Sequence, residues 1–156
     1  MNEFLEWVKQ YIADNFASDA DITKEVTVEF AYKQGNEVTT SNVPQVQVQL
    51  MDNSEVERYS SFEGENVSSV PLQITAYTGQ MKIGGVTKSA QEASIIFGQK
   101  IKEMFVASKV QSVNENVTRL VRITMSPALP LLDGSKVYAT ATRFNVWVAN
   151  PYVVGE

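Results

Sequence analysis

The sequence contains no histidine and no cysteine, and this double absence excludes more chemistry than any other feature of the chain. Without an imidazole or a thiol, the chain cannot form a Ser-His-Asp or Cys-His nucleophile system, nor a zinc site of thiolate and imidazole ligands. General acid–base catalysis at neutral pH would depend on carboxylates, lysines or tyrosines with strongly displaced pKa values. Disulfides and cofactor-binding motifs are also missing, so we expect a protein that is not an enzyme.

Positive charge and long apolar runs are scarce. The chain has 13 basic and 18 acidic residues, a formal net charge of −5, whereas gripping nucleic acid through its phosphates requires a basic surface. Residues 1–16 carry Glu3, Glu6 and Asp14 among their apolar residues, unlike a signal peptide. No segment approaches a membrane-spanning length. We therefore expect a soluble protein, made in the cytoplasm, with no membrane partner and no specific DNA binding.

The composition is that of a globular protein. Of the 156 residues, 44% are hydrophobic and 20% are charged, and 8 Gly with 5 Pro are too few for a disordered or fibrous chain. The sequence shows no internal repeat and no linker. These features predict one domain spanning residues 1–156, with a polar arm or loop at about 52–69.

Two segments have the spacing of amphipathic helices. In the first, apolar residues recur on one helical face: Phe4, Val8, Tyr11, Ile12 and Phe16. In the second, Ser89 and Glu92 stand at capping-box spacing ahead of a second apolar stripe. That stripe consists of Ala93, Phe97, Ile101, Met104 and Phe105.

Several segments have the alternation of strands. Residues 25–32 and 43–51 are predicted to pair as a loose hairpin, the second of them buried on one face only, and residues 70–78 form a third strand. Residues 119–126 and 136–150 flank Asp133-Gly134, a strong turn signal, and predict an antiparallel hairpin. The fold class expected is α+β: a mostly antiparallel sheet of about four to five strands with two main helices packed on it.

The glycine-containing stretch 77–97 raises the question of nucleotide binding. A phosphate-binding loop needs the pattern G-x-x-x-x-G-K-[ST]. Gly79 and Gly84 have the glycine spacing, but Gly85 and Val86 occupy the positions of the Lys and the Ser or Thr; in the register of Lys88-Ser89, the glycines are missing. The residues favour a turn at Gly84 and Gly85 that leads into a capped helix.

Clustered carboxylates raise the question of metal or catalytic sites. Asp14, Asp19 and Asp21 lack the spacing of an EF-hand loop, which favours a solvated connection. Residues 52–69 hold five carboxylates and a single cation, Arg58. Glu55, Glu57, Glu63 and Glu65 could form a glycosidase pair, but few apolar residues stand near them to raise their pKa values. This segment, the acidic arm, is expected to be solvated and to repel phosphate.

The C-terminal strand has apolar or aromatic residues on both faces. Tyr138, Phe144, Val146 and Val148 alternate on one face, and Trp147 lies on the other. One face can fill the core, while the second calls either for a central place in a sheet or for a partner.

The order and local pattern of these segments resemble the tail terminator proteins of long-tailed bacteriophages, which are also known as tail completion or minor capsid proteins. The resemblance covers most of the chain. It lies in the N-terminal "FLEWVKQYI", the strand "PLQITAYT", the glycine turn into "SAQEASIIFGQKIKEMF", and the closing "RLVRITMSPALP" and "VYATATRFNVWVANPY".

The resemblance implies a structural virion protein without catalysis, cofactor or metal. Such a protein would assemble in the bacterial host cytoplasm as a hexameric ring on the head-proximal end of the tail tube. The ring would stop tube polymerisation and form the surface that joins the head, with the tail tube protein and a head-completion or connector protein as partners. A monomer in solution is compatible with this. DNA would pass through the lumen without specific binding.

Within that picture, two sets of residues are expected to make contacts. Arg143, Phe144, Trp147 and Tyr152 are the predicted interface with a neighbouring subunit or the tube. Glu55, Glu57, Arg58, Glu63 and Glu65 would place the acidic arm at the lumen or at a rim, where phosphate repulsion eases the passage of DNA. Three alternatives remain: a tail tube or head-closure subunit, a host-side or regulatory binding module, and, third, an enzyme that uses only carboxylates.

Overall fold

The computed structural model describes residues 2–31, 38, 42–50, 57–60, 66–105, 117–130 and 136–149. Of these, residues 2–4, 50, 57–60, 66–71, 117–125 and 145–149 are described as backbone only. The first helix, α1, spans Asn2–Ala17, and the second, α2, spans Ala90–Met104. The strands are β1 (Thr27–Phe30), β2 (Gln45–Leu50), β3 (Glu57–Ser60), β4 (Asn66–Thr78), β5 (Met81–Ile83), β6 (Val86–Lys88), β7 (Val117–Met125), β8 (Leu129–Pro130) and β9 (Tyr138–Ala149).

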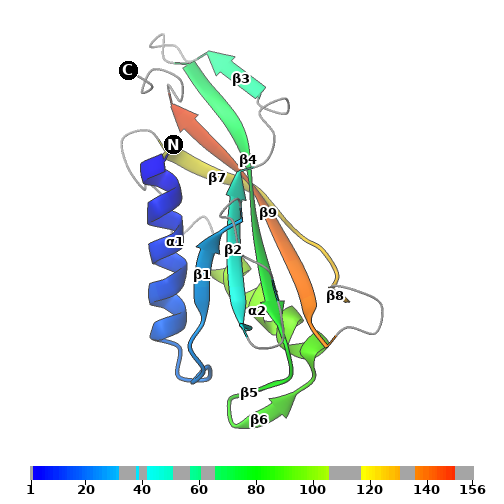
Figure 1. Ribbon diagram of the computed structural model, residues 1–156. Helices are drawn as coiled ribbons and strands as arrows, with labels where there is room; N and C mark the ends of the chain where they lie inside the picture. Colours follow the sequence, from blue (N-terminus) through cyan, green and yellow to red (C-terminus); the bar gives the residue numbers. More distant parts are fainter. Residues whose placement is uncertain are drawn as a thin grey trace.

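The main sheet follows the order β1-β2-β4-β9-β7, with β3 paired to β4 and β8 paired to β9 (Figure 1). Every pair in it is antiparallel except β1 with β2. The α+β class and the mostly antiparallel sheet with two helices are therefore confirmed. The predicted hairpin between the two last long segments is confirmed as the β7–β9 pair, while Asp133-Gly134 lies outside the described residues.

The predicted hairpin of the first two strands is wrong, because β1 and β2 run parallel, with Val28 opposite Val46. Parallel neighbours need a connection of a dozen or more residues that returns the chain to the same end of the sheet. Residues 31–44 provide that length.

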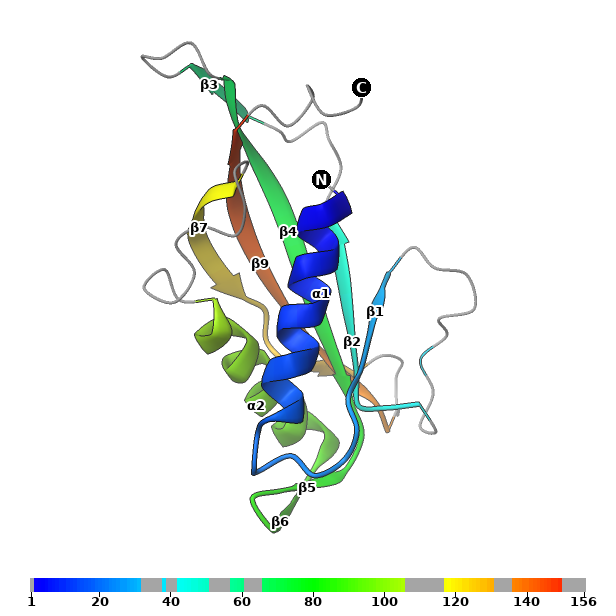
Figure 2. The ribbon, with the colours of Figure 1, turned by 90° about the vertical axis from the view of Figure 1, so that its left-hand side faces the viewer.

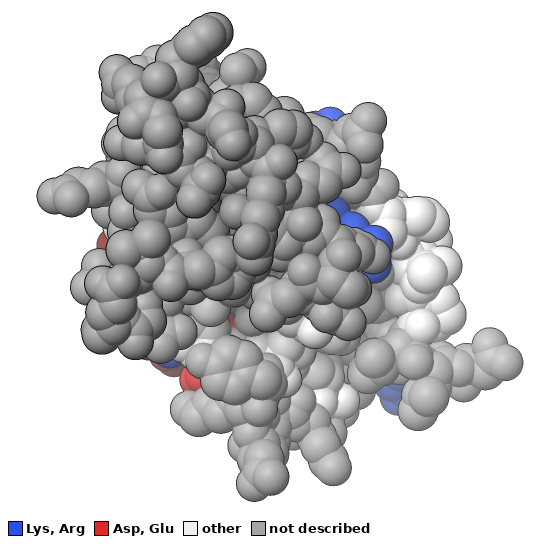
Figure 3. All heavy atoms as spheres, turned by 90° about the horizontal axis from the view of Figure 1, so that it is seen from above, with Lys and Arg blue, Asp and Glu red and all other residues white. Residues whose placement is uncertain are grey.

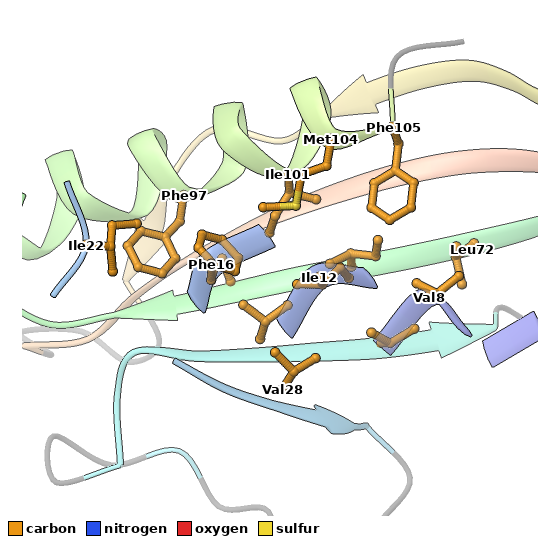
Figure 4. Close-up of a cluster of buried hydrophobic side chains, with 14 of the residues drawn as sticks. Val8, Ile12, Phe16, Ile22, Val28, Leu72, Phe97, Ile101, Met104 and Phe105 are labelled. Carbon is orange, nitrogen blue, oxygen red and sulfur yellow. The ribbon is translucent and has the colours of Figure 1, made fainter. Parts of the chain in front are cut away.

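Both helices pack on one face of the sheet, which gives a two-layer molecule (Figures 1 and 2). One hydrophobic cluster contains side chains from α1, α2 and the sheet. Strand residues of one parity supply its floor, among them Val46 and Val48 of β2 and Ile74 of β4, all 0% exposed. Figure 4 shows the helical side chains facing this floor. The periodicity predicted for both helices is confirmed by this burial.

Aromatic contacts join the two helices to each other and to β9. Phe16 of α1 stacks on Phe97 of α2, with ring centroids 5.0 Å apart. Phe105, at the end of α2, packs against Phe144 of β9 at 5.1 Å and against Tyr11 of α1 at 5.3 Å. Such ring pairs add to the area that they bury. They bring the two helices and the sheet into one core.

Short polar contacts fix the start of α2. The Ser89 hydroxyl accepts a hydrogen bond from the Glu92 N–H at 3.2 Å, as the capping-box spacing predicts. The Thr78 hydroxyl, at the end of β4, donates to the Ala90 carbonyl at 3.0 Å. The helix therefore begins at a defined place against the end of β4.

Candidate interaction surface

The face of the sheet opposite the helices is lined by polar side chains from three adjacent strands. The strand register places Gln45 of β2 beside Tyr77 of β4, Gln47 beside Thr75, and Gln49 beside Gln73. On the other side of β4, Gln73 lies opposite Arg143 of β9. We call these residues the polar sheet face: Gln45, Gln47, Gln49, Gln73, Thr75, Tyr77 and Arg143.

Hydrogen bonds orient the side chains on this face. The Arg143 Nε–H donates to Gln73 Oε1 at 2.8 Å, and the Gln73 amide in turn donates to the Thr75 hydroxyl at 3.2 Å. The guanidinium has five N–H donors, and the bond to Gln73 uses one of them. Arg143 is exposed. Its charge is thus held at the surface in a defined direction, which lowers the entropy that a partner's carboxylate would lose on binding it.

The polar sheet face is more buried at β2 than the sequence indicated. Alternation predicted a strand covered on one face only, but Gln45 is 4% and Gln47 is 8% exposed. Thr27 of β1 and Tyr77 of β4 flank Gln45 on either side. The Gln47 amide donates to Gln45 Oε1 at 2.8 Å, which satisfies part of the hydrogen bonding that burial demands.

Tyr77 adds a neutral hydroxyl to the same face. Burial of its ring and hydroxyl raises the pKa of Tyr77 above the ordinary value of 10.0, because the phenolate loses hydration. The side chain therefore stays protonated and uncharged at neutral pH. It can donate or accept a hydrogen bond there without adding to the negative charge of the protein.

The predicted interface residues fall in three different situations. Arg143 lies on the polar sheet face, but Phe144 is 1% exposed and belongs to the core, so its side chain supports the fold and does not meet a partner. Trp147 is described as backbone, paired with Ser69 of β4 and Arg119 of β7. The Trp147 side chain and the whole of Tyr152 lie outside the described residues.

The acidic arm is partly visible. Glu57 and Arg58 belong to β3, where their backbone pairs with Ser69 and Ser68 of β4. This short strand lies at one end of the long axis of the molecule (Figure 1). Glu55, Glu63 and Glu65 lie outside the described residues. The segment predicted as a polar arm or loop thus contains a short strand, β3.

The glycine stretch forms a hairpin and not a phosphate-binding loop. Gly84 and Gly85 both have positive φ, 62° and 79°, and join β5 to β6. Positive φ at both central residues is what a tight two-residue hairpin turn requires, and glycine adopts it without steric cost. The Gly84 N–H donates to the Asp21 carbonyl at 2.9 Å. The glycines are thus used in a turn that is anchored to the loop after α1.

The aspartates after α1 are engaged in structural contacts. Asp19 Oδ2 lies 2.7 Å from Lys100 Nζ of α2, and Asp19 Oδ1 accepts from the Asp21 N–H at 2.9 Å. Burial alone would raise the pKa of Asp19, but the hydrogen bonds from Lys100 and Asp21 and the nearby ammonium charge outweigh it, so the pKa lies below its usual 3.8. In the described residues, no three acidic side chains gather as a metal site would need.

A pocket of about 550 Å³ lies where β4 ends and α2 begins. We call it the β4–α2 pocket. The described residues that line it are Lys24, Val43, Pro44, Gly79, Gln80, Met81, Ser89, Ala90 and Lys136. Its volume lies within the range of sites that bind small ligands. The described part of the lining combines apolar walls with two ammonium groups and has no carboxylate.

Sequence reasoning missed this pocket, and no local signal could have revealed it. Lys24 follows α1, whereas Lys136 precedes β9, so only the fold brings them to one place. The lack of a side chain at Gly79 reflects the close packing at this pocket. A Cβ at that position would lie 3.2 Å from Val43 Cγ2 and 3.7 Å from the Lys136 carbonyl oxygen, which shows how closely the three segments approach.

Charges visible from above are dispersed. Among the described atoms that Figure 3 shows in colour, Lys and Arg lie mainly to the right and Asp and Glu mainly to the left, in small separate groups. Neither sign covers a broad area of the described surface in that view. Within the described residues, both helices are too short and too polar to cross a membrane.

Comparison with known proteins adds no identification. No family model matches the chain, and no curated protein matches its sequence.

Proposed function

We propose that this protein is a ring-forming subunit of a bacteriophage tail, which caps the tail tube, stops its polymerisation and provides the surface that joins the head. The proposal starts from the order of segments that resembles the tail terminator proteins. The observation that carries it in the fold is the polar sheet face, a surface of three adjacent strands left uncovered by both helices.

The chemistry of this face suits a subunit that must stay soluble until it assembles. A large apolar patch would aggregate free monomers, whereas amides and an oriented guanidinium tolerate water and still provide directional bonds to a neighbour. The large hydrophobic side chains exposed in the described part, Val86, Ile95 and Leu129, belong to three different elements. In a closed ring each contact is heterologous, so the polar sheet face would meet a different surface of the next copy.

Deleting the gene from the phage genome that carries it tests the proposal. Electron microscopy of the resulting lysates should show overlong tails that lack heads, because tube growth would no longer be stopped. Lysates without any tails would instead indicate a tube subunit, and normal tails with unsealed heads a head-closure subunit. Virions of normal length and infectivity would refute a role in the tail and favour a host-side binding module.

A charge reversal tests the surface. Arg143→Glu should leave the fold intact, because the residue is exposed, but should reduce complementation of the deletion by at least about tenfold by placing a like charge against the partner's acceptor. Lys102→Glu is the matched control: it makes the same change of charge on the exposed side of α2. Equal complementation by both variants would show that the polar sheet face is not part of the assembly contact.

A further inference from the structure

The β4–α2 pocket is built by segments that are distant in sequence but fixed to one another. The Thr27 N–H donates to the Pro44 carbonyl at 3.2 Å, which ties one wall to β1. The Thr78 bond to Ala90 ties the end of β4 to the first turn of α2. Val43 and Met81, 5% and 7% exposed, form apolar walls, while Lys24 and Lys136 are exposed. The pocket is thus preformed, with an apolar interior and a cationic rim.

Such a lining selects a ligand that carries negative charge beside apolar groups. A bare phosphate would satisfy the two ammonium groups but would leave the apolar walls in contact with water. An aromatic or aliphatic side chain flanked by carboxylates would satisfy both. The acidic arm has this composition. Its apolar residues Val56, Tyr59 and Phe62 lie among Glu55, Glu57, Glu63 and Glu65.

The arm of the same molecule cannot reach this pocket. The arm runs from the end of β2, where Leu50 lies opposite Leu72 of β4, to the start of β4 at Asn66. The strand β3 holds the middle of the arm against Asn66–Ser69. The pocket lies beyond the opposite end of β4, whose 13 residues span about 40 Å at 3.3 Å per residue. Residues 61–65, between β3 and β4, extend by at most about 18 Å. Figure 1 shows β3 and the β5–β6 hairpin at opposite ends.

We propose that the β4–α2 pocket binds the acidic arm of a second copy of this chain, with an apolar side chain of the arm in the pocket and its carboxylates on Lys24 and Lys136. Opposite ends of the molecule then carry complementary surfaces. The contact is heterologous, since one patch meets a different patch on the partner. This inference concerns contacts between copies and does not depend on the proposed role in a phage tail.

Binding of a labelled synthetic peptide of residues 52–65 to the full chain, followed by fluorescence anisotropy, tests the proposal. The peptide should bind at low salt and dissociate as salt is raised. The double variant K24E/K136E should bind it at least about tenfold more weakly, since two attractions become repulsions. The control K82E/K102E, with the same charge change at two exposed lysines outside the lining, should bind as the wild type does.

Two further binding experiments distinguish this ligand from other anions. A peptide with Glu63→Gln and Glu65→Gln should bind weakly. A peptide with the same carboxylates, in which Tyr59 and Phe62 are replaced by serine, should also bind weakly. Inorganic phosphate should not displace the labelled peptide at equal concentration; if it does, the pocket is a general anion site and the proposal fails. Peptide binding that K24E/K136E leaves unchanged, or no binding to the wild type, also overturns it.

A charge swap checks the contact between whole chains. In sedimentation velocity at low salt, K24E/K136E and E63K/E65K should each self-associate less than the wild type. An equimolar mixture should recover association, because each variant then supplies the surface that the other has lost. Circular dichroism of each variant confirms that it is folded. The proposal is contradicted if each variant alone associates as strongly as the wild type. It is also contradicted if the mixture of the two folded variants does not recover association.

Discussion

Two neighbouring threonines of β9 show how one hydroxyl can stabilise a core and another can weaken it. Thr140 Oγ1 lies 2.7 Å from Ser94 Oγ of α2 in a buried hydrogen bond. Thr142 is also 0% exposed, and within the described structure its hydroxyl has no partner. An unsatisfied buried hydroxyl costs about 1–3 kcal/mol, so the two positions should respond to the same substitution with opposite signs.

Replacing Thr142 by valine, which has a similar shape, should therefore raise the free energy of unfolding by up to about 1–2 kcal/mol. Thr140→Val should lower it by about 1–3 kcal/mol, because the Ser94 hydroxyl is then left unpaired. Urea unfolding with an unchanged m-value measures both. Destabilisation by Thr142→Val equal to that by Thr140→Val would mean that the Thr142 hydroxyl is satisfied after all.

The ion pair between Asp19 and Lys100 makes stability depend on pH. The folded-state pKa of Asp19 is lowered, so its contribution is fully present above the unfolded value of about 3.9 and is lost as the pH falls through the folded pKa. The side chains are 20% and 23% exposed, and solvent screening limits the effect to about 1 kcal/mol. Asp19→Asn should thus destabilise the protein at pH 7.

The difference between wild type and Asp19→Asn should shrink from pH 5 towards pH 3, as measured by urea unfolding at each pH. Lys100→Met should lose stability at pH 7 by a similar amount, because it removes the same ion pair. A difference that stays constant over this range would show that the charge of Asp19, and with it the ion pair to Lys100, is not the source of its contribution.

Among the elements, the two helices could be predicted from sequence and the strand pairing could be predicted only in part. Helical spacing and the Ser89 cap are local signals, and contacts within the same few residues produce the structure they predict. The parallel pairing of β1 with β2 depends on a crossover whose direction no residue pattern encodes. The strands β5 and β6 are three residues each, too short for a pattern to be recognised.

The candidate surfaces, too, could be predicted from the sequence only in part. Alternation puts Arg143 and Phe144 on opposite faces of β9, but only the packing of α2 decides which face meets the helices. Phe144, which the sequence predicts at an interface, therefore lies in the core. The β4–α2 pocket could not be predicted, since Lys24 and Lys136 approach it from loops at the two ends of the chain.

The N-cap of α2 offers a test at the scale of an element. Ser89→Ala removes the acceptor for the Glu92 N–H and should cost about 1 kcal/mol of unfolding free energy. Ser89→Asp keeps an acceptor and adds a negative charge at the positive end of the helix, so it should be neutral or slightly stabilising. Thermal unfolding compares the variants; equal melting temperatures for Ser89→Ala and Ser89→Asp would show that the cap contributes nothing.

At the scale of the whole molecule, one core joins both helices to the sheet. The described hydrophobic cluster takes buried side chains from α1, α2, β1, β2, β4, β5 and β9. Phe97, which stacks on Phe16, links the helices directly. Because the helices share this cluster, a cavity beneath one should loosen the other, and the described core should open as a single cooperative unit.

Phe97→Ala should therefore lower the free energy of unfolding by about 3–5 kcal/mol and reduce amide-exchange protection in α1 as much as in α2. Hydrogen exchange followed by NMR measures both helices in one experiment. Ile95→Ala is the matched control, since Ile95 lies on the exposed side of α2 at 36% exposure and should leave protection nearly unchanged. Loss of protection confined to α2 would mean that α1 and the sheet form a unit of their own, held together by contacts such as Val8, Ile12 and Val28 that do not depend on α2.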